Sequence, residues 1–126
     1  MKRTPTDILF SKYIRLLSGG YCKRCGKYLG VKSKGLHCAH WYGRGRYTTR
    51  FERDNAQALC YGCHSYLDNR PSEKAEFFFE ILGNKRATEI AVLAEKTLKD
   101  LGITKAEQEE QAKADLKEKL RLFDGI

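Results

Sequence analysis

The residues best suited to chemistry are crowded into one stretch of the chain, from Leu36 to His64. All three histidines of the 126-residue sequence lie there, together with three of the five cysteines and the single tryptophan. A neutral imidazole can accept a proton near pH 7 or bind a metal ion, and a thiolate is a strong zinc ligand. The stretch is therefore expected to hold a metal, to perform acid–base chemistry, or both.

Four of the cysteines form two pairs with metal-binding spacing. Cys22 and Cys25 make one C-x2-C pair, and Cys60 and Cys63 make a second. Two turns that each present two thiolates can surround Zn²⁺ tetrahedrally. Because no secretory signal is visible, we expect a reducing compartment, where paired cysteines more often bind metal than form disulfides. The pattern predicts a structural zinc site, and the fifth cysteine, Cys38, is expected to be a small core residue.

The histidines stand in a fixed order around the second cysteine pair. His40 precedes Asn55, and His64 directly follows Cys63 in the segment "DNAQALCYGCH". With the first cysteine pair, these features resemble the HNH nucleases, also called ββα-metal or His-Me finger nucleases. The chain looks most similar to the phage NinG (Rap) recombination proteins, which share a basic, glycine-containing segment after the first histidine, here "HWYGRGRYTTRFERDN". The resemblance covers residues 21–85 best. It implies an α+β fold, with a small zinc-stabilised ββα-metal finger flanked by N- and C-terminal helices.

The resemblance also implies a role for each member of the motif. His40, at the end of a strand, would deprotonate a water as the general base. Asn55 would hold the loop between the strands through main-chain hydrogen bonds. His64 would bind a catalytic divalent cation, Mg²⁺ or Mn²⁺, which stabilises the charge on the phosphorus centre and the leaving 3′ oxygen. The implied products are a 5′-phosphate and a 3′-hydroxyl.

The second ligand of that cation is open at this stage. Many HNH enzymes have an Asp or His just before the base, where this chain has Ala39. Residues two apart in a strand share a face, so His37 lies on the side of Ala39 and is one candidate. Asp68 is the other, because it follows His64 by four residues on one helical face. If neither binds, the chain would be a degenerate nuclease that only binds nucleic acid.

Positive charge is concentrated around the same motif. Residues 1–70 hold 14 Lys and Arg against 4 Asp and Glu, whereas residues 71–126 hold 10 against 12. A localised positive field favours a polyanion such as nucleic acid. The cations nearest the motif are expected to contact phosphates: Lys23, Arg24, Arg44, Arg46, Arg50 and Arg53. The aromatic residues Trp41, Tyr42 and Tyr47 could stack on unpaired bases or could cover the small core.

The expected function is a DNA endonuclease. The similarity to NinG proteins implies a role in phage recombination, on branched or single-stranded junction DNA, in the cytoplasm of a bacterial host. The alternative is a non-catalytic zinc-finger nucleic-acid-binding module, which would need the cysteines and arginines but not His40 and His64 in this register. No stretch approaches the roughly 20 apolar residues of a membrane span, so no membrane is expected as a partner.

Helices on both sides must position this motif. Thr4, Pro5 and Asp7 predict a helix start, and we expect an N-terminal helix within residues 1–20. Residues 21–70 are expected to form the zinc-bound nuclease core, and residues 71–126 a helical C-terminal extension.

Three further helices are predicted in that extension. The first covers residues 72–82. An apolar stripe from Ile90 to Leu101 predicts the second. The third begins at the capping box of Thr104 and Glu107 and carries one narrow apolar face, formed by Ala112, Leu116, Leu120 and Phe123. That face could pack on the core or form a homodimer.

Overall fold

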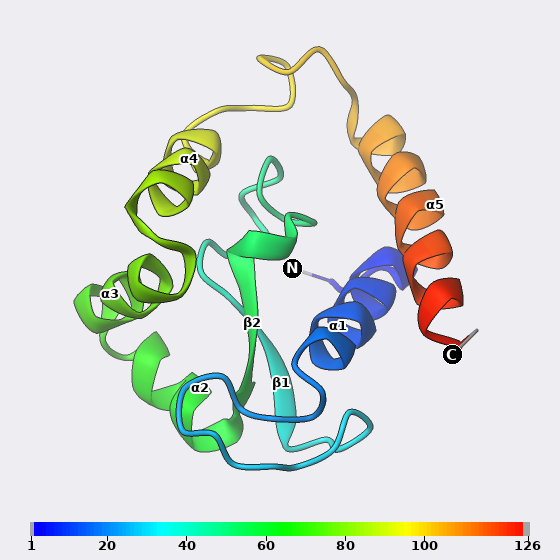
Figure 1. Ribbon diagram of the computed structural model, residues 1–126. Helices are drawn as coiled ribbons and strands as arrows, with labels where there is room; N and C mark the ends of the chain where they lie inside the picture. The colour runs from blue at the N-terminus through cyan, green and yellow to red at the C-terminus, as the bar shows by residue number, and fades with distance from the viewer. Residues whose placement is uncertain (1, 125–126) are drawn as a thin grey trace.

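A computed structural model describes residues 2–124 of the chain, which adopt a mixed α+β fold with a two-stranded sheet (Figure 1). The elements are, in chain order, α1 (Pro5–Leu17), β1 (Leu36–His40), the short 3-10 helix η1 (Arg53–Asn55), β2 (Ala56–Cys60), α2 (Tyr61–Asp68), α3 (Pro71–Leu82), α4 (Asn84–Ala94) and α5 (Lys105–Asp124). The α2 helix begins at the residue after β2, so the middle of the chain runs strand, strand, helix.

The two strands are antiparallel, and their register separates the predicted site residues onto two faces. Leu36 pairs with Cys60 and His40 with Ala56. Because side chains alternate along a strand, His37 and Ala39 share one face, whereas His40 lies on the other. His37 is therefore on the same side as Ala39, as the sequence indicated.

The helices form two groups on the two faces of the sheet (Figure 1). α1 packs against both strands and against α5. α2 packs on the opposite face and contacts α3, which in turn contacts α4. Within residues 2–124, no helix combines the length and the apolar character needed to cross a membrane.

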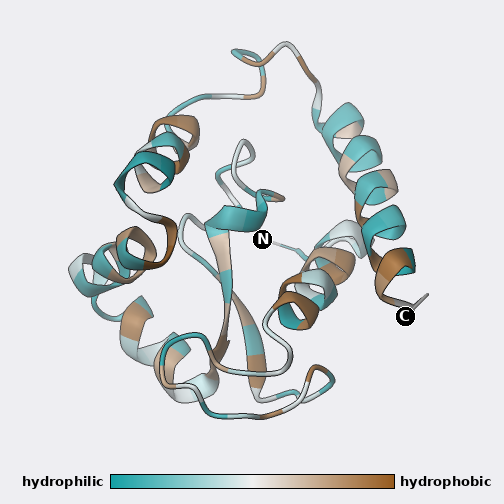
Figure 2. Cartoon of the chain, viewed as in Figure 1, coloured by the Kyte–Doolittle hydropathy of each residue, from teal (hydrophilic) through white to brown (hydrophobic). Residues whose placement is uncertain are grey.

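One hydrophobic cluster joins α1, the strands and α5. Its buried members are Phe10, Tyr13, Ile14, Leu36, Ala56, Ala58, Leu116 and Leu120. Figure 2 shows α5 as largely hydrophilic, with hydrophobic residues gathered toward its C-terminal end. The narrow face of α5 therefore packs on the core of its own chain. Because that face is buried within the chain, it is not available to join two copies. The predicted homodimer itself is not tested by the structure.

Local capping explains where the first and last helices begin. The backbone N–H of Thr4 donates to Asp7 Oδ2 at 2.8 Å, and that of Asp7 donates to Thr4 Oγ1 at 3.2 Å. Thr104 and Glu107 make the same reciprocal pair at 3.1 Å each. Each box satisfies N–H groups that have no partner inside the helix. Both predicted helix starts are confirmed.

The prediction of one continuous helix along the apolar stripe from Ile90 to Leu101 is wrong. α4 ends at Ala94, and residues 95–104 form turns and a connection. The backbone N–H of Thr97 donates to Asp100 Oδ2 at 2.9 Å, and that of Asp100 donates to Thr97 Oγ1 at 3.2 Å. This local hydrogen bonding competes with helix continuation. Leu101 is consequently 42% exposed.

A buried ion pair ties α1 to the segment between the strands. Arg50 Nη2 donates to Asp7 Oδ2 at 2.6 Å, and its Nε donates to Asp7 Oδ1 at 3.1 Å. Both residues are only 4% exposed. Arg50 is predicted from the sequence to contact the phosphates of a nucleic acid. Its position corrects that expectation, because its guanidinium is used inside the protein.

We predict that Asp7→Ala lowers the free energy of unfolding by about 3–5 kcal/mol, because it removes the carboxylate that compensates the charge of the buried Arg50 guanidinium. Denaturant unfolding measures this. The matched double variant Asp7→Leu/Arg50→Met should recover much of the loss, since no buried charge remains. Equal losses in the single and double variants would contradict the assignment.

Candidate functional site

The four paired cysteines converge on one point. Cys22 and Cys25 lie in the loop after α1, Cys60 ends β2, and Cys63 lies in the first turn of α2. Their Sγ atoms all lie within 4.8 Å of one another, and those of Cys25 and Cys60 are 3.8 Å apart. In a tetrahedral Zn–S₄ centre with Zn–S distances of about 2.3 Å, the sulfur atoms are about 3.8 Å apart. The cluster is therefore compatible with a structural zinc site.

The surroundings of the cluster shift the pKa values of Cys22 and Cys63 in opposite directions. Burial opposes ionisation of Cys22, but backbone hydrogen bonds with Cys25, Cys60 and Arg24 outweigh it and lower the pKa of Cys22 to about 6. Burial raises the pKa of the Cys63 thiol to about 12, and its hydrogen bonds with the other three thiols act in the same direction. A divalent cation would remove the repulsion that prevents the remaining thiols from ionising.

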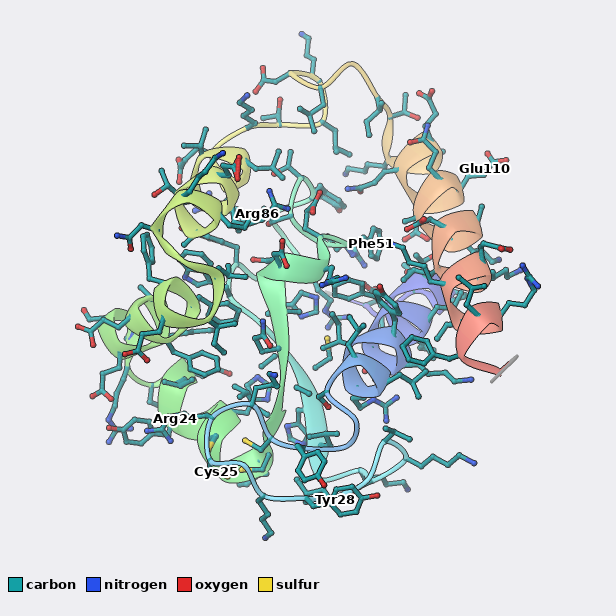
Figure 3. The ribbon with its side chains drawn as sticks, in the orientation of Figure 1. Arg24, Cys25, Tyr28, Phe51, Arg86 and Glu110 are labelled. Carbon is teal, nitrogen blue, oxygen red and sulfur yellow. The ribbon has the colours of Figure 1, made fainter. Side chains whose placement is uncertain are left out.

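Arg24 belongs to this cluster. Its Nη1 donates to Cys63 Sγ at 3.4 Å, and its guanidinium lies 4.3 Å from the centre of the Tyr66 ring. Figure 3 shows Arg24 and Cys25 close to α2. Arg24 was predicted to contact nucleic acid, but its observed contacts are with the cysteine cluster and with α2.

All three histidines line a single cleft of about 610 Å³ beside β1, between α1 and α2. Side chains from both faces of β1 line this cleft: His37 belongs to one face and His40 to the other. His64 and Asp68 reach it from α2, and Lys74 reaches it from α3. The structure thus brings together the residues that were predicted from separate parts of the sequence.

His37, His64 and Asp68 form a connected chain of polar contacts. The Nδ1 atoms of His37 and His64 are 2.9 Å apart, and His64 Nε2 lies 3.2 Å from Asp68 Oδ2. The other Asp68 oxygen accepts from Lys74 Nζ at 2.8 Å. Burial lowers the pKa of His64, although the Asp68 carboxylate opposes this effect. The lowered pKa favours the neutral form of His64, which is the form that binds metal ions.

The geometry of the two imidazoles also fits a shared cation. Two nitrogen ligands at about 2.1 Å from an ion, and about 90° apart, are separated by about 3.0 Å. The observed Nδ1 separation of 2.9 Å matches this value. Asp68 contacts the other ring nitrogen of His64, where a carboxylate typically orients a metal-binding imidazole. His64 thus faces His37 with its Nδ1 and Asp68 with its Nε2.

His40 lies at the end of β1, on the α1 side. Its ring centre is 5.5 Å from that of Phe10. Burial lowers the pKa of His40 to about 4, against a backbone hydrogen bond with Arg50 and the charge of Asp7, which favour protonation. Within residues 2–124, the buried His40 Nε2 has no hydrogen-bond partner. Such a nitrogen suits an incoming water, which can donate a hydrogen bond to it, because an unsatisfied buried acceptor costs free energy.

Asn55 holds the turn that follows His40. It is fully buried, its Oδ1 accepts from the backbone N–H of Tyr42 at 3.0 Å, and its Nδ2 donates to the Tyr42 carbonyl at 2.9 Å. The backbone N–H of Trp41 donates to the Asn55 carbonyl at 2.7 Å. These main-chain bonds are of the kind expected for Asn55, and they link the ends of the two strands.

The six predicted nucleic-acid contacts do not form one surface. Arg44 lines the histidine cleft. Arg46 donates to the Ala94 carbonyl at 2.9 Å, beside a second cavity. Lys23 and Arg53 share a smaller depression elsewhere. The remaining two, Arg24 and Arg50, have the internal contacts given above.

Trp41 packs against the buried core residue Phe78. Trp41 stacks on Phe78 with ring centres 5.2 Å apart and planes 10° apart, and the Tyr42 ring centre is 4.8 Å from that of Trp41. Of the two readings of these side chains, core packing is the one observed for Trp41.

Several cleft residues were missed by the sequence analysis. The lining includes Arg3, Asp7, Arg15, Lys34 and Lys74. One signal was available for Asp7, because a charged residue three positions before Phe10 and seven before Ile14 falls on the apolar side of the helix. No sequence pattern identifies Lys34 or Lys74 as cleft residues, because lysines occur throughout the chain.

Comparison with known proteins assigns no family to this chain. No protein-family model, no curated protein and no solved structure matches the chain. The site must therefore be interpreted from its own geometry.

We predict that the purified protein holds one zinc ion per chain and that Cys63→Ser loses it, because three thiolates complete only part of the tetrahedron. Elemental analysis by mass spectrometry measures the metal, and thermal unfolding measures the accompanying loss of stability. Cys38→Ser is the matched control, since Cys38 lies outside the cluster, and it should keep the ion. Zinc retention by Cys63→Ser, or a metal-free wild type, would refute the site.

Burial of His40 should make stability depend on pH. The unfolded imidazole takes up a proton near pH 6.5, whereas the folded one does so only near pH 4. The free energy of unfolding should therefore fall by about 2 kcal/mol between pH 7 and pH 5 through this group alone.

Urea unfolding of wild type and His40→Gln at both pH values tests this prediction. Other titrating groups act on both proteins alike, so the wild type should lose about 2 kcal/mol more than the variant. An equal loss in the two proteins would show that His40 titrates normally.

Proposed function

We propose that this protein is a metal-dependent DNA endonuclease of the HNH class, in which the ββα-metal finger is formed by β1, β2 and α2. The observation that carries the proposal is the single cleft in which His37, His40 and His64 meet. The cysteine cluster alone would serve any zinc-finger protein. Three histidines lining one cationic cleft beside that cluster are what a phosphodiesterase needs and a simple binding module does not.

His40 is the general base of the proposed reaction. Its lowered pKa keeps the ring neutral at pH 7, so its Nε2 can accept a proton from a water that attacks the phosphorus atom. Asn55 positions His40 by holding the turn that follows it. The Asp7–Arg50 pair supports His40 from the other side, because the backbone of Arg50 bonds to the imidazole.

His37 and His64 are the proposed ligands of the catalytic cation, and Asp68 orients His64. When bound, Mg²⁺ or Mn²⁺ would neutralise the charge that develops on the scissile phosphate and on the leaving oxygen. Ala39 cannot fill the position at which many HNH enzymes have a ligand. The 2.9 Å contact between the two imidazoles supports His37 as the replacement.

Phosphate binding falls to the cations of the cleft. Arg3, Arg15, Lys34, Arg44 and Lys74 line it, against two acidic residues, Asp7 and Asp68. Asp7 pairs with Arg50 and lies 3.7 Å from Arg44, and Asp68 pairs with Lys74, so the five cations still outnumber the two carboxylates. The net field in the cleft therefore favours an anionic strand, held by its backbone rather than by its sequence.

The biological role we infer is phage DNA recombination on branched or single-stranded junctions, on the similarity of "HWYGRGRYTTRFERDN" and the cysteine–histidine motif to NinG proteins. The competing function is a zinc-finger module that binds nucleic acid without cutting it, for which the cysteine cluster and the basic residues would suffice.

Plasmid and four-way-junction cleavage with Mg²⁺, Mn²⁺ or EDTA tests the proposal. Wild type should cut when either cation is present, and His40→Ala should cut about 10²- to 10⁴-fold more slowly, because a general base contributes about that factor. His37→Ala should need far more cation for half-maximal cutting. Asp68→Asn should need about 10- to 100-fold more, as expected for a carboxylate that orients a metal ligand.

Lys117→Ala, an exposed substitution on α5 outside the cleft, is the control and should cut like wild type. Zinc content and DNA binding of His40→Ala must remain normal, to show that the variant folds. Absence of cutting with any cation, with junction binding intact, would favour the non-catalytic module.

A further inference from the structure

A second cavity, of about 640 Å³, lies between the segment after the histidine cleft and the connection from α4 to α5. Tyr47, Leu98 and Ile103 are among its lining residues. Hydrogen bonds hold its two walls together, since Thr48 Oγ1 donates to the Leu93 carbonyl at 2.7 Å and Arg46 Nη1 to the Ala94 carbonyl at 2.9 Å. The cavity is large enough and apolar enough for a small planar ligand.

Cations surround this apolar cavity. Arg46, Lys96, Lys99 and Lys105 line it and are all exposed, against a single acidic residue, Glu95. This clustering is unexpected, because residues 71–126 carry more acidic than basic side chains. An apolar floor with a cationic rim complements a ligand that joins a flat apolar ring to an anion.

Tyr47 supplies an aromatic surface. The Nζ atom of Lys105 lies 4.5 Å from the centre of the Tyr47 ring, and both residues line the cavity. A nucleobase that stacked on Tyr47 would replace the ammonium on the ring, and the displaced ammonium could pair with the phosphate of the same nucleotide. Base stacking on an aromatic side chain is tolerant of sequence, because every base has a π-face.

The cavity adjoins the histidine cleft along the chain. Gly43 and Arg44 line the cleft, whereas Gly45 and Arg46 line the cavity. Consecutive Cα atoms are about 3.8 Å apart, so one short loop borders both sites. A strand whose phosphate lies in the cleft would bring a neighbouring nucleotide to the cavity.

We propose that this cavity binds one unpaired nucleotide, with its base against Tyr47 and its phosphate on the surrounding lysines, Lys96, Lys99 and Lys105. The inference rests on the proposed function in that the ligand is part of a DNA strand. It adds that the preferred substrate carries an unpaired nucleotide close to the scissile phosphate.

Fluorescence anisotropy in EDTA, where no cutting occurs, tests the proposal. Two duplexes of identical sequence are compared, one fully paired and one with a single unpaired nucleotide. Wild type should bind the second about tenfold more tightly, which corresponds to one stacked base. Ile103→Glu places a negative charge in the cavity and should abolish this preference. Tyr47→Leu, which keeps the site apolar but removes the ring, should reduce it.

Val92→Glu is the matched control. Val92 is 53% exposed on α4 and does not line the cavity, so this variant has the same change in net charge and should keep the preference. Equal binding of the two duplexes by wild type, or equal effects of the two Glu substitutions, would overturn the proposal. Because binding is measured without cutting, a failed cleavage assay would refute the nuclease and leave the nucleotide site standing. Cutting of DNA by a protein that binds the two duplexes equally well would support the nuclease and refute the nucleotide site.

Discussion

The convergence of four cysteine sulfurs is the constraint on which the rest of the structure depends. A two-stranded sheet has too little surface to stabilise itself. The cluster joins the loop after α1 to the end of β2 and the start of α2, so it fixes the direction in which α2 leaves the sheet. His64 directly follows Cys63 and takes its position from that direction. A zinc ion bound by these four sulfurs would therefore place the cleft in the same folding step.

The opposite face of the sheet is held by a different interaction. The Asp7 carboxylate accepts hydrogen bonds within the cap of α1 and also pairs with Arg50, so one side chain both starts a helix and anchors the segment beside His40. Further along, Arg86 of α4 donates from its Nε to Asp54 Oδ2 at 2.6 Å, which ties the second helical group to the residue before Asn55. Charged side chains of α1 and α4 thus hold the segments on either side of the proposed base.

Local patterns in the sequence predicted much of this architecture. The cysteine spacing predicted the cluster, capping boxes predicted the starts of α1 and α5, and alternation placed His37 beside Ala39. The failures have physical causes. Arg50 is buried because a partner 43 residues away, Asp7, compensates its charge, and no local pattern reveals such a pair. The stripe after Ile90 breaks because Thr97 and Asp100 bond each other's backbone. The cleft cations Arg3, Lys34 and Lys74 come from separate segments that only the fold brings together.

The placement of His37 and His40 three residues apart on β1 has a consequence for how this chain can change through evolution. Because the spacing is odd, the two rings lie on opposite faces of the strand, His37 toward α2 and His40 toward α1. Both rings nevertheless line the cleft, because the cleft lies beside β1. Loss or gain of one residue between them would turn both rings to the same face and would also move every later side chain of β1 to the wrong side. Substitutions within the strand can be accommodated one at a time, but its length cannot drift.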